Sequence, residues 1–179
     1  LVKDLKFNGY AVTHLDELFP KSNYDHELQL HVKEKIVQGL GKAKRGKPFL
    51  IELWEGVPVL DFANPFVHLS LDETVLGIVS GYLGMWCKLS LLSLHKTVPV
   101  PDTVDPVMSQ RWHRDPEDKV MCKVFVYLND VDENSGPLIY VPGSHYGGPW
   151  RHVAPQRPPK GYYPPPGLVE KIVPSEAVK

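Results

Sequence analysis

The stretch WHRDPEDKVMCKVFVYLNDVDENSGPLIYVPGSH, residues 112–145, decides how the fold of this chain is interpreted. Within it, residues 121–131 and 138–143 are short runs rich in β-branched and aromatic side chains, and turn-forming residues follow each run. Just upstream, residues 87–96 alternate loosely between apolar and polar side chains. Several short strands separated by turns favour an antiparallel β-sandwich or barrel.

Two helices are expected before these strands, as a supporting layer. Residues 24–40 place apolar side chains on one helical face, and residues 72–84 combine an acidic first turn with an apolar face and a final glycine. Residues 10–12, which follow Asn8-Gly9, predict a short strand entered by a turn. The basic run GKAKRGKP, residues 41–48, is interpreted as a solvated loop in preference to an anion site.

Residues 149–174 contain eight prolines, interleaved with Trp150, Tyr162 and Tyr163. Proline fixes φ and has no amide donor, so this segment cannot lie inside a helix or a sheet. We predict a long loop packed over the domain as a lid. The expected organisation is one domain, residues 1–179, with helical support to about residue 86, strands and motif over 87–148, and a lid-like loop over 149–175.

The composition narrows the class of protein. With 42% hydrophobic and 23% charged residues, the chain is expected to form one soluble globular domain. A net charge of −1 gives no electrostatic case for binding nucleic acid or an anionic membrane, whereas a small polar substrate remains possible. No apolar run approaches the ~20 residues that span a bilayer. Two cysteines form no disulfide framework, which favours the cytoplasm.

The chemistry centres on His113 and Asp115. If WHRD is extended, these two side chains project together, while Trp112 and Arg114 project to the other face. An imidazole and a carboxylate side by side make two corners of the two-histidine, one-carboxylate site of non-haem Fe(II) oxygenases. The H-x-D spacing alone is weak evidence, since an ordinary polar turn has the same pattern.

The order of features after WHRD makes the pattern more specific. An apolar strand leads to the acidic turn at residues 129–133, then to GPL and to PGSH at residues 142–145. Over residues 110–148 this closely resembles the phytanoyl-CoA dioxygenase-like family of Fe(II)- and 2-oxoglutarate-dependent oxygenases. The resemblance implies a mainly β fold with supporting helices, a double-stranded β-helix (cupin-like jelly-roll) incomplete at its carboxyl end. It also implies O2 as co-substrate and hydroxylation of a small organic molecule, with release of succinate and CO2.

The resemblance assigns His113 and Asp115 as catalytic iron ligands and implies that Phe125 packs beside the co-substrate. Strand alternation puts Lys123 on the same face as Phe125. Lys123 then either pairs with a carboxylate of 2-oxoglutarate or substrate, or extends from a strand edge into solvent, which is the favoured interpretation. Lys96 is a weaker candidate for the same contact.

Other side chains have weaker claims on the site. Tyr127 shares the face of Phe125, and Trp112 and Trp150 are either substrate contacts or, more commonly for such residues, core and lid aromatics. In the family that the motif resembles, the histidine at the position of His145 is structural. His152, in the proline-rich segment, is interpreted as a lid or surface residue.

The resemblance further implies a distal histidine ligand and, about ten residues later, a basic anchor for the far carboxylate of 2-oxoglutarate. The chain has no histidine after His152 and no arginine after Arg157. We expect the chain to stop short of those strands; alternatively, His152 substitutes, or the protein is a non-catalytic jelly-roll binding module with an incomplete metal site. A zinc hydrolase or isomerase of cupin type fits less well, because such sites draw more histidines from one motif.

Overall fold

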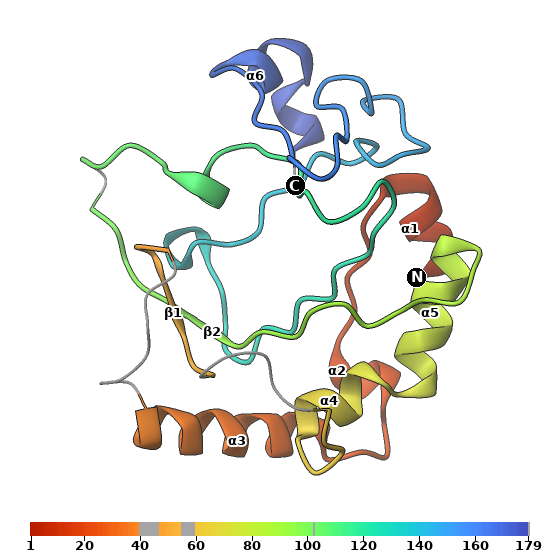
Figure 1. The fold of residues 1–179 in the computed structure, drawn as a ribbon, viewed down its shortest axis with the longest axis vertical. Helices are drawn as coiled ribbons and strands as arrows, with labels where there is room; N and C mark the ends of the chain where they lie inside the picture. The colour runs from red at the N-terminus through yellow and green to blue at the C-terminus, as the bar shows by residue number, and fades with distance from the viewer. Residues whose placement is uncertain (40–46, 55–59, 102, 179) are drawn as a thin grey trace.

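The computed structural model describes residues 1–39, 47–54, 60–101 and 103–178, and helices dominate its regular structure (Figure 1). The α-helices are α1 (Val2–Asn8), α2 (Leu15–Leu18), α3 (Tyr24–Gly39), α4 (Pro65–Ser70), α5 (Glu73–Leu83) and α6 (Leu168–Ile172). Strands β1 (Leu50–Glu52) and β2 (His95–Thr97) pair antiparallel, with Leu50 opposite Thr97. Short 3-10 turns are η1 (Met108–Gln110), η2 (Glu133–Ser135) and η3 (Ser175–Ala177).

Both helices expected from hydrophobic periodicity are present. The predicted helix over residues 24–40 is α3, which buries Tyr24 and Leu28. The predicted helix over residues 72–84 is α5, whose first turn is capped by the Asp72 carboxylate, which accepts a hydrogen bond of 2.8 Å from the Thr74 amide. In Figure 1, α3 lies along the lower edge of the molecule, and α5 runs beside α1 on the right, with which it is in contact.

The amino end differs from its prediction. The strand expected at residues 10–12 does not form, and the preceding residues make α1 instead. Gly9 ends α1 in the left-handed region, at φ 82°, and a Cβ there would clash with the Tyr140 hydroxyl and the His145 ring. The Asn8-Gly9 pair therefore terminates a helix. Of the basic run predicted as a loop over residues 41–48, residues 41–46 lie outside the described residues.

The prediction of a mainly β jelly-roll is wrong for the described residues, whose only strands are the short pair β1 and β2. Residues 121–127 and 138–140 form no helix or strand, and no backbone hydrogen bond between described residues joins either segment to another. The Leu138 amide, which a strand pair would give to a carbonyl, donates to the Tyr127 hydroxyl at 3.1 Å. Val124 at 59% and Phe125 at 54% in the first segment, and Leu138 at 54% in the second, are exposed. Val126 and Leu128 pack, partly buried, against the core around Leu28, so the first segment covers the core without pairing as a strand.

The amino-terminal core is built by α3, α4 and the segments next to β1 and β2. Its buried residues are Tyr24, Leu28, Leu53, Trp54, Phe66, Leu69 and Leu94. The Trp54 and Phe66 rings meet edge to face, with centres 5.5 Å apart. Fully burying one such side chain stabilises a fold by about 1.5–3 kcal/mol, so this cluster supplies a large part of the stability.

A second, smaller cluster lies where the motif meets the carboxyl end of the chain. We call it the valine cluster; it consists of Val141, Val153, Val169 and Val173. Trp112 and Trp150 pack against it, partly buried. Figure 1 shows α6 at the top of the molecule, at the opposite end from α3. The motif therefore gains its apolar support from the carboxy-terminal segment.

The prediction of no helix within residues 149–174 is wrong for α6, which forms in the proline-free stretch between Pro166 and Pro174. No helix in the described ranges is long and apolar enough to cross a membrane.

Candidate metal centre

The WHRD motif is extended at its centre because it pairs with the proline-rich segment. Arg114 and Tyr162 form an isolated antiparallel bridge, in which the Arg114 amide donates to the Tyr162 carbonyl at 2.7 Å and the reverse bond measures 3.1 Å. The Arg114 guanidinium donates to the carbonyls of Ala154, at 2.7 Å, and of Ser144. These contacts hold Arg114 toward the carboxy-terminal segment.

His113 and Asp115, which flank Arg114, come together on the same side of the chain. The distance between His113 Nε2 and Asp115 Oδ1 is 3.5 Å. The other ring nitrogen of His113, Nδ1, donates to the Arg111 carbonyl at 2.7 Å. In the neutral imidazole this bond places the proton on Nδ1 and leaves the Nε2 lone pair directed toward Asp115. The Tyr163 ring stacks on the imidazole, with centres 5.8 Å apart and planes inclined by 27°.

This donor pair fits two neighbouring ligands of an octahedral metal. With metal–ligand bonds of about 2.1 Å, neighbouring donor atoms stand roughly 3 Å apart, so a small movement of either side chain from 3.5 Å suffices. An Nδ1–H bond to a main-chain carbonyl is also the usual partner of a metal-binding histidine. Among the residues that the structure describes, however, no group of three His, Cys, Asp or Glu side chains is placed to hold a metal. His152 is exposed and does not join the pair.

Lys123 pairs with the second oxygen of the Asp115 carboxylate. Its ammonium Nζ lies 2.8 Å from Asp115 Oδ2 and 3.9 Å from Glu117 Oε1. The sequence predicts a co-substrate or substrate carboxylate, or solvent, as the partner of Lys123, and neither interpretation includes Asp115. Strand alternation compares neighbours along one strand, so it carries no signal for a contact between the motif and the next segment.

Contacts within the pair, and the nearby Lys123 ammonium, shift the pKa values of His113 and Asp115. The hydrogen bond to His113, together with the Lys123 ammonium, holds the pKa of the Asp115 carboxyl well below its usual range, although burial acts in the opposite sense. The hydrogen bond to Asp115 raises the pKa of His113 against the effect of burial and of Lys123. An incoming metal ion must therefore displace a proton that His113 holds more tightly than a free imidazole does.

Residues 154–170 fix the motif from outside, and we call them the carboxy-terminal clamp. The Trp112 indole donates to Glu170 Oε1 at 2.7 Å, and the Gln156 amide donates to the main-chain carbonyls of Asp115, at 2.5 Å, and Asp118, at 2.8 Å. Gly161 crosses the motif so closely that a Cβ would lie 2.7 Å from the Arg114 carbonyl oxygen. The sequence contained no signal for Gln156 or Glu170, because these bonds join residues 41 and 58 positions apart.

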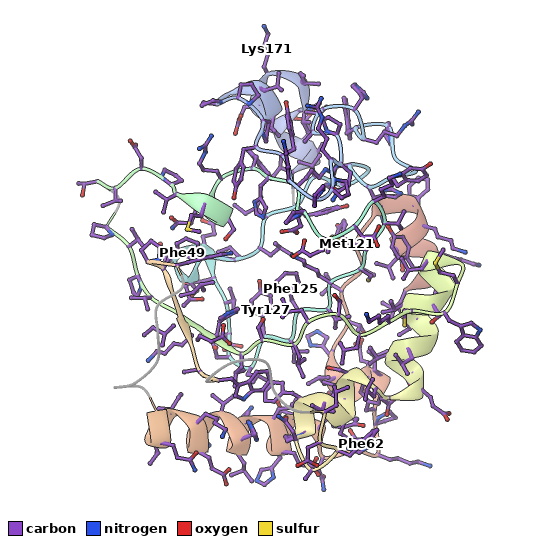
Figure 2. All side chains as sticks on the ribbon, in the orientation of Figure 1. Phe49, Phe62, Met121, Phe125, Tyr127 and Lys171 are labelled. Carbon is purple, nitrogen blue, oxygen red and sulfur yellow. The ribbon has the colours of Figure 1, made fainter. Side chains whose placement is uncertain are left out.

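The remaining sequence candidates are more scattered. Phe125 and Tyr127 are about half exposed on the extended segment that crosses the middle of the view in Figure 2. Lys96 is exposed on β2, opposite Ile51 of β1. Trp150 packs against the valine cluster, and His145 is buried with its Nε2 bonded to the Lys6 carbonyl at 3.1 Å.

Comparison with known proteins gives one finding. The model of the phytanoyl-CoA dioxygenase (PhyH) family matches residues 63–167, which is more than half of the chain. The matched range contains His113, Asp115, Lys123 and the PGSH turn. No curated protein and no solved structure matches the chain significantly. The family match confirms the resemblance read from residues 110–148.

Proposed function

The chain belongs to the phytanoyl-CoA dioxygenase (PhyH) family, and on that premise we propose that it is a non-haem Fe(II)- and 2-oxoglutarate-dependent dioxygenase that hydroxylates a small organic molecule. The family consists in general of Fe(II)/2-oxoglutarate oxygenases, so the general kind of reaction follows from membership. In the proposed reaction one atom of O2 enters succinate, the other enters the substrate as a hydroxyl group, and 2-oxoglutarate loses CO2. The cytoplasm is the proposed compartment.

One observation supports the proposal most strongly: His113 Nε2 and Asp115 Oδ1 face each other at 3.5 Å, while His113 Nδ1 is hydrogen-bonded to the Arg111 carbonyl. His113 and Asp115 would hold the iron. Bound Fe(II) supplies, with 2-oxoglutarate and O2, an oxidant able to break a C–H bond. The carbonyl of Arg111 fixes the imidazole tautomer, and the stacked Tyr163 ring limits the rotation of the His113 ring.

The proposed contacts with the small molecules follow from exposure. Phe125 and Tyr127 present about half of their surface to solvent, which leaves apolar area for a co-substrate and a substrate. Trp112 and Trp150 are weaker candidates for the substrate because they pack against the valine cluster. Lys96 remains a proposed co-substrate contact, with no observation in its favour beyond its exposure on β2.

An activity assay tests the proposal. Purified protein is incubated with Fe(II), 2-oxoglutarate and O2, and succinate is measured, since many such oxygenases slowly convert 2-oxoglutarate without their substrate. We expect iron-dependent succinate that disappears in His113→Ala, with His26→Ala, a substitution of an exposed histidine on α3, as the matched control. Succinate formation that is independent of iron, or unchanged in His113→Ala, would contradict the proposal.

A non-catalytic binding protein is the second candidate function. Its support is that the part of the chain described by the structure brings no third metal ligand to His113 and Asp115. Anaerobic equilibrium dialysis against Fe(II) separates the two: the oxygenase proposal requires one ion bound per chain, whereas the binding protein requires none.

A further inference from the structure

The two oxygen atoms of the Asp115 carboxylate face different partners. Oδ1 lies 3.5 Å from His113 Nε2, and Oδ2 lies 2.8 Å from the Lys123 ammonium. Lys123 is held in turn by Glu117, whose Oε1 is 3.9 Å away. The carboxylate is thus oriented with one oxygen toward the proposed metal position and the other toward a cation of the protein itself.

From this geometry we infer that Lys123 is a positioning residue, which makes Asp115 a metal ligand through Oδ1 alone by occupying Oδ2. The inference rests on the proposed function, because it needs a metal between His113 and Asp115. The consequence of such single-oxygen binding concerns the number of coordination sites on the metal that remain free for small molecules. A carboxylate that binds through both oxygens takes two coordination sites, whereas one that binds through a single oxygen leaves an extra site for a small molecule.

Lys123 does not stand in for the metal. An ammonium at the metal position would contact both ligands. Among the described residues, Lys123 pairs closely with Asp115 and more distantly with Glu117, and no hydrogen bond joins it to His113. Its charged contact is to the carboxylate oxygen that does not face the imidazole. Metal-binding carboxylates are usually hydrogen-bonded to a second group of the protein, and the contact between Asp115 Oδ2 and Lys123 is of this kind.

Removal of Lys123 should change metal affinity in opposite directions, depending on whether Lys123 orients Asp115 or acts only as a nearby positive charge. Lys123 is a cation, so by Coulomb repulsion its removal favours binding of a second cation nearby. The repulsion is screened, because the Lys123 side chain is 40% exposed. Loss of a residue that orients a ligand has the opposite effect and typically weakens metal binding by about 10–100-fold. A positioning role therefore predicts weaker binding on removal of a positive charge.

The test is an anaerobic titration with Mn(II), followed by the electron paramagnetic resonance signal of the free ion. Five proteins are compared: wild type, Lys123→Met, Lys123→Arg, the control Lys119→Met and the ligand variant His113→Ala. The control removes the same charge from an exposed lysine in the same segment. We expect Lys123→Met to raise the Kd for Mn(II) by about tenfold or more, Lys123→Arg to recover most of the loss because a guanidinium still donates to Oδ2, and Lys119→Met to match wild type.

The outcomes separate this inference from the function on which it rests. Equal or tighter Mn(II) binding by Lys123→Met overturns the positioning role, provided that its thermal unfolding curve matches that of the wild type. If Lys123→Met unfolds early, Lys123→Arg decides: a Kd as poor as that of His113→Ala overturns the role, and a Kd near wild type supports it. A wild-type protein that binds no Mn(II) sinks the proposed function itself.

Discussion

The amino-terminal core and the motif region are held together by different interactions. The core buries large apolar side chains between helices, with Leu28 fully buried on α3. The motif region has a small cluster of valines, and its main support comes from hydrogen bonds between motif and carboxy-terminal clamp, such as Arg114 to Ala154 and Gln156 to Asp115. The stability of the amino-terminal core depends on how completely side chains fill its interior, whereas the motif region depends on the geometry of its hydrogen bonds. Stability and metal affinity should therefore respond to different substitutions.

The largest expected loss of stability comes from the amino-terminal core. Leu28→Ala removes a fully buried side chain and should lower the free energy of unfolding by about 2–5 kcal/mol, which urea denaturation measures. The Kd of the folded variant for Mn(II) should stay within about twofold of wild type, since Leu28 belongs to the amino-terminal core and not to the valine cluster that supports His113 and Asp115. A large loss of Mn(II) affinity would show that the two regions are not separable.

Arg114→Lys should affect both properties at once. A lysine cannot donate to the Ala154 and Ser144 carbonyls in the geometry of the guanidinium, so a half-buried carbonyl loses its partner. We expect a loss of about 1–3 kcal/mol in unfolding free energy, together with weaker Mn(II) binding. Unchanged Mn(II) affinity in a destabilised Arg114→Lys protein would mean that the clamp does not hold the ligand pair.

Glu170→Gln is a milder probe of the clamp. It keeps an acceptor for the Trp112 indole but removes the charge that strengthens the 2.7 Å hydrogen bond. The expected loss is about 0.5–1.5 kcal/mol, visible as a small decrease in Tm. Glu176→Gln is the charge-matched control, because Glu176 lies on η3 beyond the clamp. Equal Tm values for the two variants would contradict a role for the Trp112–Glu170 bond.

The pH dependence should be the smallest effect on stability and the most specific to the pair. His113 has a raised pKa in the folded protein, so its contribution is present below about pH 6.5 and is lost as the pH rises through that raised pKa. Asp115 has a lowered pKa, so its contribution is present above about pH 4 and is lost as the pH falls through the lowered value. The pair should therefore stabilise the metal-free protein most between these limits.

A titration of the His113 ring by NMR checks this expectation. Asp115→Asn removes the main cause of the shift, so the pKa of His113 should fall in that variant. Because the metal requires a deprotonated imidazole, Mn(II) affinity of the wild type should also increase from about pH 6 to pH 8. An unchanged His113 pKa in Asp115→Asn would refute the coupling.

The sequence predicted what local periodicity determines. The helices α3 (Tyr24–Gly39) and α5 (Glu73–Leu83) were predictable because apolar spacing, and for α5 its caps, act within a few turns. The same kind of pattern over 121–131 predicted a strand that does not form, since a strand also needs a backbone partner and alternation does not supply one. The family match supports the general chemistry assigned to the motif, whereas the assignment of His113 and Asp115 as ligands stays a prediction. The contacts of Lys123 and Gln156 with Asp115 join residues from different segments, and no pattern in a single sequence predicts such contacts.

Coordination of a bound metal by His113 is central to the proposed function and can be observed directly. In pulsed electron paramagnetic resonance of the Mn(II)-loaded protein, an imidazole ligand produces nitrogen modulation of the echo. We expect modulation in the wild type that persists in His26→Ala and disappears in His113→Gln. Modulation that survives in His113→Gln, with Mn(II) still bound, would contradict this expectation.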